Sequence, residues 1–215
     1  GPGSGKGFSL DNQILIDGKV IDVDHLKELY SKVSDENWDF NNPDDVYKLH
    51  MKIKNKGWKQ DLYNLFFNSN DRLENIIFDI TGKRFESLKD YTRMCREIGY
   101  KTSLVWVVTN RMWAMFRNMN RDRTVPEDVF HNIHNQLKDT VFQFLNKRDI
   151  ERYVDEAWVI FSGDAGTFKG ENPVDSARDL QGTVHKFEKK GGEFVIPEDL
   201  KRRVYKHLGP QEPEP

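Results

Sequence analysis

The chain has 215 residues but a single cysteine, Cys95, and this scarcity excludes two structural devices. An internal disulfide needs two cysteines, and a zinc site built on cysteines needs more than one. A lone thiol also fits a reducing compartment, where disulfides are rare. The sequence further lacks an apolar run of about 18 residues, the length that a membrane-spanning helix needs, and it shows no signal peptide. We therefore expect a cytoplasmic protein.

Neither sign of charge dominates, because 33 Lys and Arg stand against 35 Asp and Glu, for a net charge of -2. A chain of balanced charge has no overall attraction for nucleic acid, so only a local basic patch could bind it. What is present is an apolar fraction of 37%, which is enough for a core, and a charged fraction of 32%, which predicts much solvated helix surface. The length fits one globular domain, or one domain with a small appendage.

Short apolar runs of the strand type alternate with segments of helical periodicity. The predicted strands are 19–24, 75–79, 103–109 and 156–161, with a possible edge strand at 194–196. The predicted helices are 25–33, 43–67 with a possible break near Gly57, 87–99, a short one after Arg111, 126–147, 173–190 and 197–207. This alternation predicts an α/β fold of three layers, with a mainly parallel sheet and helices on both faces.

The same pattern predicts the domain organisation. We expect an α/β core over residues 1–161, followed by a C-terminal loop, helices and a possible edge strand over 162–209. The Pro- and Glu-rich tail, 210–215, is expected to be disordered.

The first nine residues, GPGSGKGFS, have the composition of a phosphate-binding loop. Glycines let backbone N–H groups crowd around a phosphate, and a lysine then reaches the outer phosphates. The predicted nucleotide-binding residues are Gly3, Ser4, Gly5, Lys6 and Gly7. The hydroxyl of Ser9 is the candidate ligand for Mg²⁺. The string Gly-Pro-Gly-Ser is also a common remnant of protease cleavage, so a partly accidental match stays open.

Polar residues follow two of the predicted strands. Asp22 and Asp24 end the first strand, and Asp79 and Thr81 end the second. The carboxyl ends of parallel strands line the ligand crevice of an open α/β sheet, where a carboxylate can accept a proton from a substrate hydroxyl. The structural alternative is that Asp24 caps the helix that follows and Asp22 belongs to a turn.

Arg117 and Arg123 lie in the stretch 111–134, which follows the third predicted strand and restarts as a helix at Pro126. Arginine binds phosphate through a rigid fork that is always charged, so the two residues could clamp a phosphate. A solvated helix face is the alternative, because charged residues are mostly exposed. His131 and His134 have no third ligand near them in the sequence, so no metal site is expected there.

In this order the parts resemble the zeta-toxin and nucleotide-kinase-like group of P-loop kinases, from Gly1 to about Phe161. The GSGK at 3–6 resembles the phosphate loop, and Asp24 falls on the catalytic aspartate that precedes a helix in this group. Asp79-Ile-Thr81 resembles the group's substrate contact. Arg123-Thr-Val-Pro126 resembles the Arg-x-x-Pro of the lid, with Arg117 in the place of the first lid arginine.

The resemblance implies a kinase that uses ATP or GTP with Mg²⁺. The implied acceptor is a hydroxyl or phosphate group, as on a nucleotide, a nucleotide sugar or a nucleic-acid end. The implied catalytic residues are Lys6, Asp24, Arg117 and Arg123, and the implied acceptor contacts are Asp22, Asp79 and Thr81.

The sequence departs from the group's pattern at two points. No buried strand precedes Gly1, and Phe8 stands near the position of the magnesium ligand. These departures leave a second hypothesis open, that of a non-catalytic binding or interaction module on a degenerate P-loop kinase fold.

Overall fold

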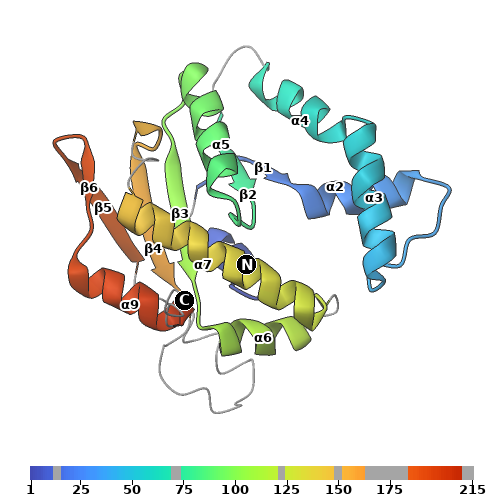
Figure 1. Ribbon diagram of the computed structural model, residues 1–215. Coiled ribbons are helices and arrows are strands. Elements are labelled where there is room, and N and C mark those ends of the chain that lie inside the picture. Colours follow the sequence, from blue (N-terminus) through green and yellow to red (C-terminus); the bar gives the residue numbers. More distant parts are fainter. Residues whose placement is uncertain (12–15, 69–73, 121–123, 148–151, 163–183, 210–215) are drawn as a thin grey trace. The chain divides into compact units, whose positions relative to one another are not determined.

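The computed structural model describes residues 1–11, 16–68, 74–120, 124–147, 152–162 and 184–209 (Figure 1). The chain divides into two compact units. Unit 1 comprises Gly1–Ile14, Thr81–Arg121 and Glu127–Pro215, and unit 2 comprises Leu15–Ile80 and Asp122–Pro126. Both units combine helices with strands, so the protein belongs to the mixed α/β class. In the described part of the chain, no helix combines the length and the apolar character needed to cross a membrane.

Unit 2 begins with a two-stranded parallel sheet. Strand β1 (Lys19–Asp22) pairs with strand β2 (Ile76–Asp79), and the register places Asp22 opposite Asp79. Helix α2 (Val23–Val33) follows β1 directly because Asp22 caps it, accepting a hydrogen bond from the backbone N–H of Asp24. The predicted cap at Asp24 is therefore wrong. The cap lies two residues earlier because an extended Asp can reach the N–H of the second helical residue.

Helices α3 (Pro43–Asn55) and α4 (Trp58–Phe67) complete unit 2. Asn42 caps α3 and Pro43 occupies its first turn, as expected for a helix start. Gly57 separates the two helices at φ +73°, a conformation that favours glycine, and this confirms the predicted break. The three helices of unit 2 pack around four buried side chains: Leu26, Tyr30, Leu49 and Ile53.

Unit 1 is built on a four-stranded mixed sheet in the order β3-β4-β5-β6. Strands β3 (Ser103–Val108) and β4 (Glu156–Phe161) are parallel. Strands β5 (Val184–Lys190) and β6 (Glu193–Val195) continue the sheet in antiparallel pairings. The described strands thus form two sheets rather than one mainly parallel sheet.

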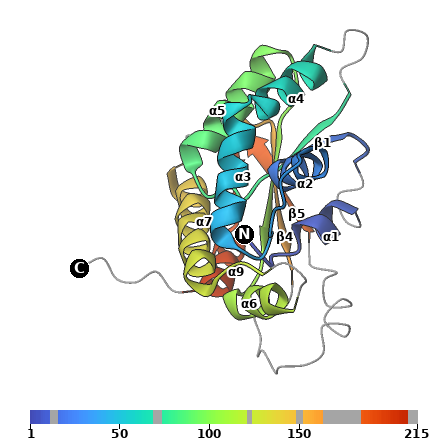
Figure 2. The ribbon, with the colours of Figure 1, turned by 90° about the vertical axis from the view of Figure 1, so that its right-hand side faces the viewer.

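Five helices belong to the described part of unit 1: α1 (Lys6–Ser9), α5 (Phe85–Glu97), α6 (Arg111–Met119), α7 (Glu127–Lys147) and α9 (Glu198–Leu208). Helices α5 and α7 lie along one face of the sheet (Figure 2). Phe144 of α7 joins helix to sheet, because its ring lies 6.2 Å from that of Trp106 on β3 and 6.3 Å from that of Phe187 on β5. Helix α9 packs at the same core through Val204, which is fully buried.

One predicted element is wrong. Residues 184–190 were expected to end a helix that begins at Pro173, whereas they form strand β5. The rest of that predicted helix, most of the Gly-rich loop before it and the predicted tail, 210–215, lie outside the described residues.

Candidate functional site

The predicted phosphate loop forms a tight turn that leads into helix α1. Gly3 and Gly5 adopt left-handed conformations, with φ +70° and +83°, and Gly5 stands at the N-cap of α1. The N–H of Ser4 donates to the carbonyl of Gly1 at 3.2 Å, which closes the turn. Lys6 is then the first residue of the helix. A glycine-rich turn opening into a helix start presents backbone N–H groups in the way that anion-binding loops do.

Close packing against helix α6 explains why position 3 is a glycine. A Cβ atom at Gly3 would lie only 2.0 Å from the carbonyl oxygen of Ala114. Gly1, Pro2 and Ser4 are buried, and the carbonyl of Pro2 accepts a hydrogen bond from Nε2 of His134 at 2.9 Å. This packing favours the interpretation in which residues 1–4 belong to the fold.

Arg117 of α6 lies against the loop. Its Nη1 donates to Oγ of Ser162 at 3.0 Å and to the carbonyl of Gly3 at 3.4 Å. Its Nη2 is buried and has no hydrogen-bond partner among the described residues. Burial lowers the pKa of Arg117 from its ordinary value. A buried N–H without an acceptor carries an energetic penalty, which an anion at the loop would remove.

The remaining residues that the sequence predicts to bind the nucleotide or its Mg²⁺ are Gly7, Ser9 and Arg123. Arg123 lies outside the described residues. Gly7 is exposed on α1, with open space around the position of a Cβ atom. Ser9, the predicted magnesium ligand, is only 1% exposed at the end of α1, which leaves its hydroxyl poorly placed to meet a metal ion.

His131 and Cys95 of unit 1 have structural roles. Arg111 Nε donates to Nδ1 of His131 at 3.0 Å, and its Nη1 donates to Asn135 at 3.1 Å. Arg111 is therefore engaged between α6 and α7. Burial raises the pKa of the Cys95 thiol to about 11, which keeps it protonated and unreactive at neutral pH. Among the described residues, no cluster of three His, Cys, Asp or Glu side chains could hold a metal.

The predicted acidic residues gather in unit 2. Asp22 and Asp79 face each other in the register at the carboxyl ends of β1 and β2. Asp24, in the first turn of α2, has a carboxylate that is 60% exposed and accepts a hydrogen bond from Nζ of Lys27 at 2.8 Å. Parallel pairing thus brings together two residues, Asp22 and Asp79, that the sequence placed at two strand ends, and Asp24 follows in the first turn of α2. Thr81, half-buried, belongs to the start of the second segment of unit 1.

Sequence reasoning missed three polar residues at these places. Ser162, which binds Arg117, is held by Thr109, whose hydroxyl donates to the carbonyl of Ser162 at 2.6 Å. The sequence could have indicated Ser162, because it lies directly after a buried strand. Lys27, which binds Asp24, could have been identified from the sequence because it lies three residues after Asp24, a spacing at which two side chains on a helix can interact. His50 lies on α3, and the charges of Lys27 and Asp24 act on its pKa. No sequence pattern indicated this relation.

Comparisons of the chain with protein-family models, with curated proteins and with solved structures found no match. The structure defines a mixed α/β protein with a glycine-rich turn in unit 1 and a group of carboxylates in unit 2.

Proposed function

We propose that the chain is an ATP- or GTP-dependent phosphotransferase that acts on a hydroxyl or phosphate acceptor. The observation that carries the proposal is the contact of Arg117 with the glycine-rich turn, with a buried Nη2 that lacks an acceptor among the described residues. Phosphoryl transfer depends mainly on positioning and on positive charge around the transferred group. A loop of N–H donors with an ammonium and a guanidinium supplies both.

The roles follow from the chemistry of each group. Backbone N–H groups at Gly3, Gly5 and Gly7 and the ammonium of Lys6 would bind the phosphates, and Arg117 would neutralise charge that develops during transfer. The donor set fits a polyphosphate because all of its members are donors or cations. Arg123, which lies outside the described residues, is proposed as the second clamp residue on the strength of its motif.

Asp24 is the proposed group that orients or deprotonates the acceptor hydroxyl, because its carboxylate is exposed and held by Lys27. Asp22, Asp79 and Thr81 are proposed acceptor contacts. Mg²⁺ would arrive bound to the nucleotide phosphates, as is usual for this ion. The residues at the loop offer it a poor fit, since Ser9 is buried, so no step is assigned to a protein-bound metal.

The burial of Ser9 favours a second candidate function, a module that binds an anion or nucleotide without turnover. Hydroxyl ligation of Mg²⁺ is part of the usual phosphate loop, and Gly7 stands where that hydroxyl is normally found. Under this alternative the chain would bind ATP–Mg²⁺ but would not transfer its phosphate to any acceptor.

Isothermal titration of ATP–Mg²⁺ into the full chain tests the proposal. Lys6→Ala and Arg117→Ala should each weaken binding roughly 10- to 100-fold, the cost of a charge-assisted hydrogen bond. Arg93→Ala is the matched control, because Arg93 lies on α5 and is paired with Asp90 of the same helix at 3.0 Å. Arg111 is less suitable, since it binds His131 and Asn135. If ATP–Mg²⁺ does not bind at millimolar concentration, the proposal is wrong.

A further inference from the structure

Helix α6 presents apolar side chains to the outside of unit 1. Four of its residues recur at the i, i+3, i+4 and i+7 spacing of a single helical face, and we call them the methionine face: Met112, Met115, Phe116 and Met119. Met112 is 60% exposed and Met119 is 68% exposed, whereas the two residues between them are half-buried. The most exposed positions of this helix thus include two large apolar side chains.

The charged side chains of α6 point the other way. Arg111 donates hydrogen bonds to two side chains of α7, and Arg117 donates to the carbonyl of Gly3. Ala114 and Asn118 are buried on the same inner side, with exposed fractions of 0% and 2%. A helix at a protein surface normally turns its charges to water and its apolar stripe to the core. In α6 both arginines are turned inward and the methionine face is turned outward.

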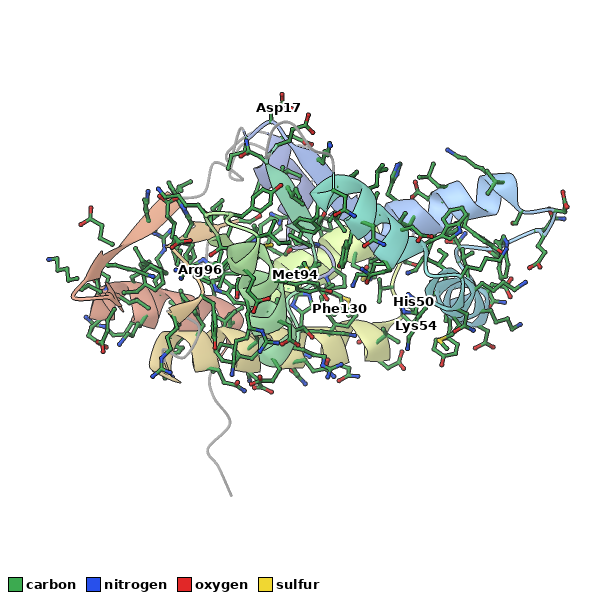
Figure 3. All side chains as sticks on the ribbon, turned by 90° about the horizontal axis from the view of Figure 1, so that it is seen from above. Asp17, His50, Lys54, Met94, Arg96 and Phe130 are labelled. Atoms are coloured by element: carbon green, nitrogen blue, oxygen red, sulfur yellow. The ribbon has the colours of Figure 1, made fainter. Side chains whose placement is uncertain are left out.

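The methionine face carries no charged residue. Methionine and aromatic residues are enriched at the centre of protein interfaces, where charged residues are depleted, and homodimer interfaces are the more apolar ones. A face with charges of one sign would repel its own copy, whereas an uncharged face can pack against itself. The other two methionines of the chain lie singly, Met51 on α3 and Met94 on α5, where Figure 3 labels Met94.

The spacing of the methionine face reads the same from either end of the helix. Met112 and Met119 lie toward its two ends, and Met115 and Phe116 lie at its middle. In a two-fold contact, residue i meets residue j of the second copy and j meets i. Antiparallel packing of two α6 helices would therefore pair Met112 with Met119, and Met115 with Phe116. It would also place opposite ends of the two helix dipoles side by side. A groove on an unrelated protein would not require this symmetry.

We propose that α6 is a self-association site, at which two copies of this chain pack antiparallel through the methionine face. A standard stable interface buries about 800 Å² on each partner. A helix of nine residues is only about 13 Å long and supplies the apolar centre of such an interface. We therefore expect a weak dimer, with a dissociation constant in the micromolar range. The proposal is independent of the proposed function, because Arg117 lies on the opposite side of the helix.

Sedimentation velocity of the full chain, from low micromolar to near-millimolar concentration, tests the proposal. The wild type should pass from a monomer of 25.3 kDa toward a species of about twice that mass. The double variant Met112→Lys, Met119→Lys should stay monomeric, because the dimer would bury the introduced ammonium groups facing each other. Leu65→Lys is the matched control, since Leu65 is 66% exposed on α4, and it should associate like the wild type.

Cross-linking tests the antiparallel arrangement. Cys95 is buried, with a pKa raised to about 11, so introduced cysteines should react first. With oxidised glutathione, an equal mixture of Met112→Cys and Met119→Cys chains should form disulfide-linked dimers. Met112→Cys alone should cross-link much more slowly, because its two copies would lie about 10 Å apart along the helix pair, beyond the Cα separation of a disulfide.

Three results would overturn the proposal. The first is a wild-type chain that stays monomeric at every concentration, and the second is an equal loss of association in Leu65→Lys. The third is a monomer that binds neutral phosphatidylcholine vesicles through Met112 and Met119, which would assign the face to a lipid surface. Faster cross-linking of Met112→Cys alone than of the mixture would overturn the antiparallel arrangement.

Discussion

His134 ties the start of the chain to helix α7. Its Nε2 lies 2.9 Å from the carbonyl of Pro2, and its ring stacks on Phe130 with centroids 4.2 Å apart. Because a carbonyl can only accept, Nε2 carries a proton and donates it to this hydrogen bond. Burial lowers the pKa of His134 to about 4. The same side chain therefore makes the fold sensitive to acid.

The stability of the fold should fall as the pH is lowered through the window between the two pKa values of His134. In the unfolded chain its pKa is about 6.5. Between that value and a folded pKa of about 4, the unfolded chain binds more protons, so the free energy of unfolding decreases with decreasing pH. The contribution is complete above pH 6.5 and amounts to roughly 3 kcal/mol, at about 1.4 kcal/mol per pKa unit.

Urea unfolding from pH 7.5 to 4.5 checks this expectation. His134→Gln keeps a donor near Pro2 but cannot titrate, so its stability should depend less on pH across this window. His25→Gln is the control, because the His25 side chain is 64% exposed and its loss should leave the wild-type slope. Identical slopes for wild type and His134→Gln would contradict the role assigned to this residue.

At the residue scale, the sequence can predict the placement of a side chain when that placement depends on where a strand ends. Asp22 and Asp79 could be assigned to the same edge because parallel strands end at the same edge, and the register of β1 and β2 places the two residues opposite each other. Lys27 and His50 could not be joined in this way. Their proximity depends on how α2 and α3 pack, which local periodicity does not specify.

At the scale of elements, the glycine-rich turn depends on two properties of Gly3: its positive φ and the close approach of α6. Gly3→Ala would place a Cβ 2.0 Å from the carbonyl of Ala114, at a φ of +70° that L side chains rarely adopt. We expect it to lower the free energy of unfolding by roughly 1–3 kcal/mol or more, and to weaken ATP–Mg²⁺ binding as the turn shifts.

Gly7→Ala is the matched control for Gly3→Ala. A Cβ at Gly7 meets no atom within 4 Å, and the residue lies inside helix α1. Alanine there should be neutral or stabilising by at most about 1 kcal/mol. Thermal melting of both variants gives the comparison. Equal melting temperatures would show that the turn does not pack against α6 as described.

Strand β5 shows why a local sequence pattern can predict the wrong type of secondary structure. In Val184–Lys190 only Phe187 is fully buried, so the segment has too few apolar side chains to separate a strand from a helix by period. The decisive signal was the next dipeptide. Gly191 and Gly192 have φ +62° and +89°, as in a two-residue hairpin turn, and they join β5 to β6. A Gly-Gly pair between two short polar segments could have indicated the hairpin.

At the scale of the whole molecule, the sequence predicted the alternation of helices and strands but not how the strands divide between sheets. Residues 76–79 and 103–108 are both apolar strands, yet one pairs with β1 and the other with β4. Strand pairing is a long-range property, and each strand alone satisfies the same local pattern. Most of the proposed roles divide in the same way, with the glycine-rich turn, Lys6 and Arg117 in unit 1 and the carboxylates in unit 2.

This division predicts that variants in the two units affect different kinetic parameters. Asp24→Asn removes a base but keeps a side-chain oxygen for Lys27, so it should leave ATP–Mg²⁺ affinity unchanged and slow phosphoryl transfer roughly 10²- to 10⁴-fold, the usual contribution of a general base. Arg117→Ala should instead weaken nucleotide binding. Asp35→Asn, an exposed carboxylate that follows α2, is the control for charge.

Calorimetry of nucleotide binding and a coupled assay of ADP release, run with a panel of small acceptors that bear a free hydroxyl or phosphate group, separate these effects. The assay also distinguishes the kinase from the binding module, since only a kinase releases ADP in an acceptor-dependent way. If Asp24→Asn weakens ATP–Mg²⁺ binding as much as Arg117→Ala does, Asp24 serves the nucleotide rather than the acceptor. If it transfers phosphate at the wild-type rate, Asp24 is not the base, and the exposed carboxylate held by Lys27 has only a structural role in the first turn of α2.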